Sequence, residues 1–590
     1  MAASIMAVYL VLITLAASHH LVMAQAGLLK KPLYGLLYCF YQQRVWLGAT
    51  ALFMFASSSL ALHKLKDMIA YSKARRGLGG MASCLAYLAL GLLLLYSGRY
   101  APWQQLLLAI AFLAAPYLFT HQDIQNPTRG TKHSIHLLGK AGQTLPLNAP
   151  ELGVCIVGAP GSGKTKYVIE PLLYRMIAQG YAGLLYDYDF SAQNAGRDYS
   201  LTHLAYHCCK HFTKGKTRFV CINFEDLFTS ARINPIAPPY IQDRNSLTHI
   251  LRTLLLNMQP GQQEDFWYKN TYALLKGVVI FLANNYPQLC TLPHVIIAGL
   301  QPIEQTMAML QLDQEATLYA SPILDAYKHA PEQLAGVMAN FKVTLDRLLD
   351  PHIFWVLSGN DTPHIVNDPA QPTVVCLGNT PTKKESLGPI LAMLTAFLSA
   401  NMYGRGRPKS FLMLDELPTL FLPQLAEVPA TARKYGMATI VALQNLAQLE
   451  KRYGMVGAAE LQDTFSNHLT GRSQLRVAKE WSERVGKQET HTSSHTISKH
   501  QESETIHEKE KTILTPQESM HLAVGEFVGS IAASDQPFFR MKLRPISHYH
   551  AQLSYASFEP LPITNPHVQA QANFLKIQQT VKELVGREML

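Results

Sequence analysis

The segment that most constrains this chain is the glycine-rich run Gly158-Ala159-Pro160-Gly161-Ser162-Gly163-Lys164-Thr165. It fits the spacing G-x-x-x-x-G-K-[ST], in which glycines let the backbone curl until its N–H groups point at a polyphosphate. In this pattern the lysine, here Lys164, reaches the β and γ phosphates, and the hydroxyl of Thr165 holds Mg²⁺. We therefore predict that residues 158–165 bind ATP together with Mg²⁺.

The residues on either side of this run have the context that a phosphate-binding loop requires. Residues 154–157, Val-Cys-Ile-Val, are typical of a short buried strand, and residues 166–179 are typical of a helix despite the early Pro171. A helix that begins directly after the loop adds the positive field of its N-terminus to the phosphate site. The alternative is a Gly/Ser turn that matches the pattern by chance.

A second strand-like run supplies the acidic residues that such a site needs. Four apolar residues, 411–414, are followed by Asp415 and Glu416. In this arrangement Asp415 binds Mg²⁺, directly or through water, and Glu416 polarises the attacking water as a general base. A strand that merely ends in a turn is the alternative, but the presence of the glycine-rich run in the same chain favours a nucleotide site.

The length and composition of the chain set broader limits. With 590 residues the chain is expected to hold more than one domain. A net charge of +10 suits a nucleic acid or an anionic membrane as a partner, although basic residues flanking membrane helices produce the same excess. The eight cysteines include no C-x-x-C pair, and Cys155 and Cys376 lie inside apolar runs, which indicates a reduced, cytosolic main body.

The N-terminal part of the chain is unusually apolar. Its four long apolar runs cover residues 2–26, 46–62, 81–97 and 102–120. Each approaches or reaches the roughly 17–25 residues that span a bilayer, so we predict about four transmembrane helices; buried helices of a soluble domain are the alternative. The first run also resembles a secretory signal that ends near Ala24-Gln25-Ala26.

The charges between these runs set the expected orientation. Five basic residues lie between the second and third runs: Lys64, Lys66, Lys73, Arg75 and Arg76. The positive-inside bias places this loop in the cytosol, so the chain leaves the fourth run in the cytosol as well. The nucleotide site is therefore expected on the cytoplasmic side.

The remainder of the chain alternates strand-like and helical segments. Strands are predicted at residues 154–157, 183–186, 218–222, 373–377, 410–414 and 437–443, which indicates a mostly parallel α/β sheet. Helical patterns dominate from about 244 to 357, with one long helix from Phe266 to Asn284, and predict an inserted all-α lobe; extra helices on the sheet face are the alternative.

Two segments near the C-terminus have distinct patterns. Residues 487–511 are almost free of apolar side chains and are expected to form an exposed loop. Pro566 follows Asn565 as a helix-start signal, and an apolar stripe at helical spacing follows at Phe574, Ile577, Val581 and Leu584. That stripe favours docking onto the chain's own domain over a site for a partner.

The order of these features resembles the type IV coupling proteins, which are ring ATPases of conjugation and type IV secretion. Local runs carry the resemblance: Arg232-Ile233-Asn234-Pro235, Asp265-Phe266-Trp267, Asp415-Glu416-Leu417-Pro418, Arg433-Lys434-Tyr435-Gly436 and Ile440-Val441-Ala442-Leu443-Gln444. The N-terminal Leu37-Tyr38-Cys39-Phe40-Tyr41 is similar to the membrane region of Bacteroidetes-type members. The chain departs from the family at Asp187-Tyr188-Asp189-Phe190, where many members have Asp-Pro-Lys-Gly.

The resemblance implies a fold and a division into parts. The expected fold class is α/β, a RecA-like P-loop ATPase domain with an inserted all-α domain, preceded by an all-α transmembrane region. The expected parts are a transmembrane region (1–125), the first part of the nucleotide-binding domain (126–243), the all-α domain (244–360), the second part of the nucleotide-binding domain (361–550) and a C-terminal tail helix (551–590).

The resemblance also implies roles for two further residues. Arg433 is expected to be an arginine finger that reaches the nucleotide of a neighbouring subunit, with a solvated surface arginine as the alternative. Gln444, at the end of a strand, fits a sensor that orients the attacking water or detects the γ phosphate, and a polar strand end is the alternative. Glu416, Arg433 and Gln444 are thus the expected catalytic residues.

The implied function is that of a bacterial inner-membrane, multi-pass motor. Six copies are expected to form a ring that hydrolyses ATP and drives single-stranded DNA, with its relaxase, toward the channel proteins of a type IV secretion system. Basic residues that would contact phosphates are Lys383, Lys384, Arg405, Arg407 and Lys409, although for any one of them a solvated loop is the more ordinary explanation.

Two other functions and one metal site are weaker interpretations of the same sequence. One is an ATP-gated platform that recruits protein effectors without pumping DNA. An ABC-type transporter would need a Leu-Ser-Gly-Gly signature, from which Leu357-Ser358-Gly359-Asn360 departs. A group of metal-ligand types within residues 203–211, namely His203, His207, Cys208, Cys209 and His211, is more consistent with a surface helix than with a zinc site.

Overall fold

The computed structural model describes residues 134–587, apart from 192–198, 214, 260, 262–263, 486, 499–500, 535–537 and 550–558. The four predicted membrane-spanning runs and the Bacteroidetes-like region at 37–41 lie outside the described residues. Within the described ranges, no helix combines the length and the apolar character needed to cross a bilayer.

The described chain contains a nine-stranded mixed sheet with the strand order β13-β12-β9-β3-β8-β7-β4-β6-β5. The seven strands from β9 to β5 are parallel to their neighbours, whereas β12 is antiparallel to both β9 and β13. The strands are β3 (Val154–Val157), β4 (Ala182–Asp187), β5 (Arg218–Ile222), β6 (Thr373–Gly378), β7 (Ser410–Leu414), β8 (Met437–Leu443), β9 (Asn467–Thr470), β12 (Glu526–Ser530) and β13 (Phe538–Lys542).

The central strands are apolar because both faces of the sheet are covered. Every residue of β4, β6, β7 and β8 is buried, as expected for parallel strands between two helical layers. Successive side chains alternate between two cores: Leu185 packs with helices α5 (Glu170–Ala178) and α6 (Leu201–Phe212), whereas Leu184 and Tyr186 pack into the opposite core with α15 (Lys384–Ala400).

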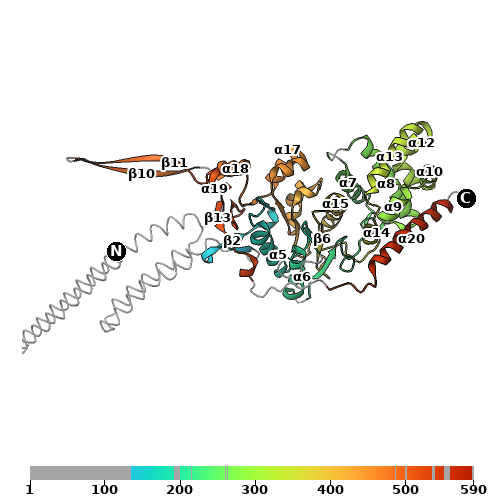
Figure 1. Cartoon of the computed structure of the whole chain (residues 1–590), viewed down its shortest axis with the longest axis horizontal. Coiled ribbons are helices and arrows are strands. Elements are labelled where there is room, and N and C mark those ends of the chain that lie inside the picture. The colour runs from blue at the N-terminus through green and yellow to red at the C-terminus, as the bar shows by residue number, and fades with distance from the viewer. Residues whose placement is uncertain are drawn as a thin grey trace, which may run out of the picture. The chain divides into compact units, whose positions relative to one another are not determined.

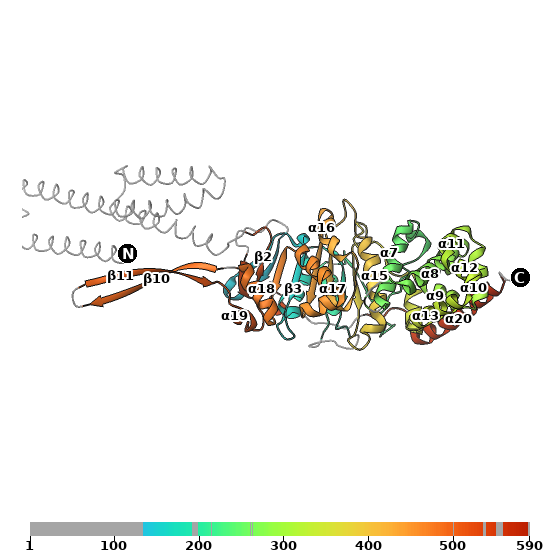
Figure 2. The same cartoon turned by 90° about the horizontal axis from the view of Figure 1, so that it is seen from above.

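In the described residues between β5 and β6, where the sequence predicted an all-α lobe, eight α-helices follow one another. They are α7 (Arg244–Met258), α8 (Phe266–Asn285), α9 (Leu292–Gly299), α10 (Ile303–Gln311), α11 (Gln314–Tyr319), α12 (Ser321–His329), α13 (Pro331–Asp346) and α14 (Pro351–Leu357). Figure 2 shows α8 to α13 gathered beside one another, away from β3. The division into domains at residues 244 and 360 stays a prediction.

The C-terminal helix α20 (Pro566–Arg587) packs against this group of helices, as its apolar stripe predicted (Figure 1). Its contacts are with α9, α10 and α14. Ile577 and Val581 are buried, and the ring of Phe574 lies 4.9 Å from that of Phe354 between centroids. The stripe therefore docks onto the chain itself.

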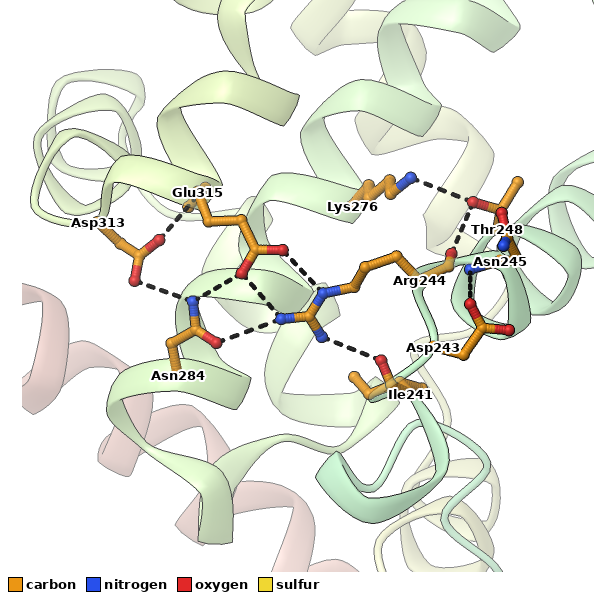
Figure 3. A network of polar contacts seen from close by, with 10 residues as sticks. Ile241, Asp243, Arg244, Asn245, Thr248, Lys276, Asn284, Asp313 and Glu315 are labelled. Carbon is orange, nitrogen blue, oxygen red and sulfur yellow. Dashed lines mark hydrogen bonds and ion pairs between the residues drawn. The ribbon is translucent and has the colours of Figure 1, made fainter.

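A polar network ties three of these helices together (Figure 3). Arg244, at the start of α7, forms a bidentate ion pair with Glu315 of α11, with both N···O distances 2.8 Å. Asn284 of α8 accepts a hydrogen bond from Arg244 and donates to Asp313 and Glu315. A fork of this kind fixes orientation as well as proximity, so α7, α8 and α11 are held in one arrangement.

The described residues also form four further α-helices and a small sheet. The helices are α16 (Val428–Ala432), α17 (Leu446–Thr464), α18 (Leu475–Val485) and α19 (Pro516–Met520). Strands β1 (Ile135–Leu138) and β2 (Thr144–Leu147) form a two-stranded antiparallel sheet.

The prediction of an exposed loop at 487–511 is wrong. Strands β10 (Lys487–Ser498) and β11 (Gln501–Thr512) pair in antiparallel fashion from Lys487↔Thr512 to Ser498↔Gln501. A shortage of apolar side chains argues against a core, but backbone N–H and C=O groups still pair without one. The β-branched residues of the segment, threonines and two isoleucines, favour an extended chain.

The helix predicted at 166–179 differs at its beginning. Residues Thr165–Ile169 form a π-helical turn, η4, and the regular helix α5 starts at Glu170. Pro171 has no N–H group to donate to the carbonyl four residues earlier, and the N–H of Glu170 donates instead to the carbonyl of Thr165. The wider turn therefore directly follows the glycine-rich run.

Candidate nucleotide site

The parallel pairing brings the predicted site residues to one edge of the sheet. Val157 of β3 is opposite Leu443 of β8, and Leu414 of β7 is opposite Val441. The residues that follow these strands are the glycine-rich run, Gln444 and the Asp415-Glu416 pair. Because the carboxyl ends of parallel strands meet at the same edge, all three lie side by side at the point where open α/β sheets bind ligands.

The glycine-rich loop is fixed to the strands on both sides. The N–H of Gly158 donates to the carbonyl of Leu443 at 3.2 Å, and that of Ala159 donates to the carbonyl of Arg472 at 2.8 Å. Gly161 and Gly163 have φ of 73° and 93°, a region that side chains disfavour. A Cβ atom on Gly163 would lie 2.7 Å from the ring of Tyr167, so a larger residue does not fit there.

Two side chains of the loop suit a bound anion. Lys164 is 9% exposed, and its Nζ donates to the carbonyl of Gly158 at 2.5 Å, across the loop. The Ser162 hydroxyl is buried and has no hydrogen-bond partner among the described residues. Burial lowers the pKa of Lys164, against the opposing effect of the nearby Glu416 and Asp415 carboxylates. Polyphosphate oxygens would supply the countercharge that this lysine needs.

The two carboxyl groups after β7 lie in a region crowded with negative charge. Asp415 keeps part of its surface exposed, but protein surrounds its carboxyl group. Burial, followed by repulsion from Asp187 and Glu416, raises the pKa of Asp415 to about 8. Burial also raises the pKa of Glu416. Such a carboxylate group fits a divalent cation, whose charge would remove the repulsion.

Glu416 has a backbone conformation that is uncommon for a residue with a side chain. Its φ and ψ are 62° and 60°, in the left-handed region. The N–H and hydroxyl of Thr419 donate to its carbonyl at 3.1 and 2.8 Å. A non-glycine residue in this region costs on the order of 1–3 kcal/mol, and such residues cluster at functional sites.

A chain of hydrogen bonds beneath the site supports this conformation. The Asn379 amide donates to the Tyr186 hydroxyl at 3.0 Å, and that hydroxyl is 2.8 Å from the Thr419 hydroxyl. Because the Thr419 hydroxyl donates to the carbonyl of Glu416, the Tyr186 hydroxyl is the donor to Thr419. Residues at the ends of β4 and β6 thus position the residue after β7.

Gln444 lies beside Glu416 at the nucleotide edge of the sheet. Burial raises the pKa of the Glu416 carboxyl, and the nearby Lys164 ammonium and the amide and backbone N–H of Gln444 act in the opposite direction. The predicted base and the predicted sensor are therefore neighbours in the structure. Thr165, the predicted second Mg²⁺ ligand, is half-buried directly after Lys164.

Arg433 lies apart from all of these residues. It precedes β8, whereas Gln444 follows it, so the seven residues of β8 separate the two. At about 3.3 Å per residue that is roughly 20 Å, longer than any side chain. The Arg433 side chain is exposed and forms no ion pair within the described part of the chain.

The predicted basic residues divide in the same way between the two edges. Lys383 and Lys384 follow β6, at the nucleotide edge, and both are exposed. Arg405, Arg407 and Lys409 precede β7, at the opposite edge. The two groups therefore do not form a single basic surface.

Asp187 is the residue that sequence reasoning did not assign. It ends β4, is 1% exposed, and accepts hydrogen bonds from the N–H and hydroxyl of Thr202 at 2.9 and 2.6 Å. Its charge contributes to the raised pKa of Asp415. The sequence did contain a signal for both Asp187 and Asn379, because each is a polar residue at the end of an apolar, strand-like run.

The histidine and cysteine group on α6 is not on a surface helix as expected. His203, His207, Cys208 and Cys209 are buried against the sheet, and His211 alone is exposed. Burial lowers the pKa of His203 to about 4. Across the residues that the structure describes, no set of three or more such side chains is arranged to hold a metal ion.

Comparison with known proteins identifies the class to which this fold and site belong. The family described as Type IV secretory system Conjugative DNA transfer matches residues 203–528, more than half of the chain. The chain belongs to this family and is a type IV coupling protein. The expected P-loop ATPase fold, α/β with a mixed sheet, is confirmed.

Individual relatives are similar over different extents. Coupling protein TraD of Escherichia coli (strain K12) is 35% identical over 92 residues, which are 15% of this chain and 13% of that protein. The unbound bacterial conjugative coupling protein TrwBdeltaN70 matches with a TM-score of 0.56 and 15% identity, over 73% of this chain and 91% of that structure. TrwB in complex with ADP and Mg²⁺ matches with a TM-score of 0.55 and 16% identity, over 74% and 93%.

Proposed function

We propose that this chain is a membrane-anchored hexameric ATPase that couples a relaxase with its single-stranded DNA to a type IV secretion channel and drives their transfer. Membership of the conjugative DNA-transfer family supports the DNA substrate and the channel. The nucleotide complexes of TrwB, which has the same fold, support ATP and Mg²⁺ as ligands. The apolar runs before residue 121 support attachment to the inner membrane, with the ATPase part in the cytoplasm.

The residues at the nucleotide edge have complementary roles in this proposal. The backbone of residues 158–165 and Lys164 bind the phosphates, and Thr165 and Asp415 hold Mg²⁺, which neutralises charge on the β and γ phosphates. Glu416 accepts a proton from the attacking water, and Gln444, which follows β8 at the same edge of the sheet, orients that water.

The separation of Arg433 from the nucleotide site supports a ring in which neighbouring subunits share each site. The P-loop, the carboxylates and Gln444 are at one edge of the sheet, while Arg433 is at the other, about 20 Å away. An arginine finger in that position serves only a nucleotide on another subunit. Repeating this head-to-tail contact around a closed ring completes every site with a residue from a neighbour.

The division of the chain in this proposal follows the parts expected from the sequence. Residues 1–125 anchor the chain, 126–243 and 361–550 form the nucleotide-binding domain, 244–360 form the all-α domain, and 551–590 form the tail helix. The burial of α20 against α9 and α14 supports a tail that belongs with the all-α domain.

The direct test of the nucleotide site is Lys164→Ala in the full chain. We expect ATP turnover to fall to background, because the mutant lacks the one ammonium group buried in the loop. Membrane insertion, measured by fractionation of cells, remains intact because the loop is remote in sequence from the apolar runs. Normal turnover in the purified mutant would refute the assignment.

A further inference from the structure

Asn257 lies at a junction between the helical segment and the nucleotide site. It is the last residue but one of α7 and is 8% exposed. Its Oδ1 accepts from the N–H of Phe421 at 2.9 Å, while its Nδ2 donates to the carbonyl of the same residue at 2.7 Å. The side chain thus binds one backbone unit of a neighbouring loop with both ends of its amide.

The other hydrogen-bonding positions of this amide are also occupied. Nδ2 donates to the carbonyl of Thr253 at 2.8 Å, within α7, and Oδ1 accepts from Nη2 of Arg452 in α17 at 2.7 Å. Both donors and both acceptor positions of the asparagine are therefore used. No other residue type of this size offers both two donors and two acceptor positions, so this arrangement of hydrogen bonds requires an asparagine at position 257.

The loop that Asn257 holds begins at the candidate catalytic carboxylates. It runs from Glu416 through the short helix η8 (Leu417–Thr419) to Leu422. The Tyr453 hydroxyl donates to the carbonyl of Leu420 at 3.0 Å and accepts from the N–H of Leu422 at 3.1 Å. With Thr419 bonded to the carbonyl of Glu416, the backbone is held at both ends of this loop.

Helix α17 forms the second connection between the same two places. It begins at Leu446, two residues after Gln444, which follows β8 at the same edge of the sheet as Glu416. Arg452 and Tyr453, in its second turn, reach Asn257 and the loop. Gly454 then has φ of 74° and interrupts the helix, so the stretch 446–453 is separated from the remainder of α17. The loop after Glu416 and the start of α17 after Gln444 therefore both connect the nucleotide edge to Asn257.

We propose that Asn257 is a positioning residue that couples the nucleotide site to the helical segment from α7 to α13. When Glu416 and Gln444 change position with the state of the nucleotide, the loop and the start of α17 pass the displacement to Asn257 and thus to α7. In the reverse direction, a substrate bound on these helices changes the orientation of Glu416. This inference rests on the proposed ATPase function and names a way in which that site is regulated.

The test compares two asparagines of the same helical segment in the full chain. Asn257→Leu keeps the approximate size of the side chain and removes all four hydrogen bonds. Asn284→Leu is the matched control, because Asn284 joins Arg244, Asp313 and Glu315 (Figure 3) and has no contact with the loop. Tyr453→Phe is the second test variant, since it detaches the loop from α17 by loss of one hydroxyl.

Three quantities are measured for each protein: steady-state ATP hydrolysis, the Kd of a non-hydrolysable ATP analogue, and hydrogen–deuterium exchange of peptides from α7 to α13 with and without that analogue. We expect nucleotide-dependent exchange in the wild type and in Asn284→Leu. We expect Asn257→Leu and Tyr453→Phe to lose that difference and to show kcat lowered by roughly 3- to 30-fold, with the Kd of the analogue within about 3-fold of wild type.

Each result separates this inference from the proposed function. If the wild type hydrolyses ATP but Asn257→Leu retains the nucleotide-dependent exchange, or if Asn284→Leu abolishes it equally, the coupling role of Asn257 is refuted. If Asn257→Leu does not fold, Tyr453→Phe decides between the same two outcomes. A wild type that does not hydrolyse ATP refutes the proposed function itself.

Discussion

Replacing Arg433 by alanine tests whether each nucleotide site is shared between two subunits. Arg433 is separated from the nucleotide edge by the length of β8, so Arg433→Ala leaves its own loop and carboxylates intact. We expect normal ATP binding and a loss of turnover of about 10³- to 10⁵-fold, the range for an arginine finger. Lys164→Ala has the opposite defect: it keeps Arg433 but lacks a competent loop.

Mixing the two inactive variants then restores activity by an amount that the ring geometry fixes. A working interface needs an Arg433→Ala subunit, with its intact loop, beside a Lys164→Ala subunit, with its intact arginine. At equal proportions each condition is met half of the time, so about a quarter of the interfaces are complete in a head-to-tail ring. ATPase rate against mixing ratio in co-expressed complexes should therefore rise to a maximum at equal proportions.

An arginine that acts within its own subunit gives a different curve. No subunit in the mixture then holds both an intact loop and an intact arginine, so the rate stays at background at every ratio. Mixed rings must be verified by differential tagging of the two variants. A flat curve with mixed rings present would refute the shared site.

Two further predictions concern carboxyl groups. Asp415→Asn should weaken Mg²⁺-dependent nucleotide binding. Glu416→Gln should bind ATP normally but hydrolyse it at least about 10²-fold more slowly. Equal binding defects of the two variants in equilibrium titrations would contradict this division of roles. Burial raises the pKa of Glu170 to about 7, so the folded state binds this proton more tightly than the unfolded state does. The free energy of unfolding therefore falls as the pH rises from about 4.5 to 7, by at most about 3 kcal/mol. Glu170→Gln should therefore raise the melting temperature at pH 8 and change it little at pH 4, and an equal shift at both would contradict the linkage.

The strands around the site could be predicted because parallel strands covered on both faces must be apolar throughout. The runs at 154–157, 218–222, 410–414 and 437–443 match β3, β5, β7 and β8 residue for residue. In a parallel sheet, the position of a residue just after a strand then determines the edge at which it lies. This reasoning brought together Lys164, Asp415, Glu416 and Gln444 before their contacts were known.

Other features depend on contacts between residues distant in the chain, which periodicity does not reveal. Asn257 and Arg452 are 195 positions apart, and nothing in the pattern of α7 distinguishes Asn257 from an ordinary polar residue near a helix end. The hairpin of β10 and β11 was missed because hydrophobicity measures the tendency to be buried and not backbone pairing. The π-helical turn before Pro171 was also missed. Prolines are common in the first turn of ordinary α-helices, so the position of Pro171 gave no sign of a wider turn.

The central claim is that nucleotide hydrolysis by this chain serves the movement of single-stranded DNA. The most direct measurement is ATP hydrolysis by the full-length protein in detergent, with and without single-stranded DNA, at low and at high salt. We expect stimulation several-fold above the basal rate that weakens as salt rises, because DNA binding releases counterions, and that disappears in Glu416→Gln. An unchanged rate, together with no DNA binding at low salt, would contradict the claim and favour an ATP-gated platform that recruits protein effectors.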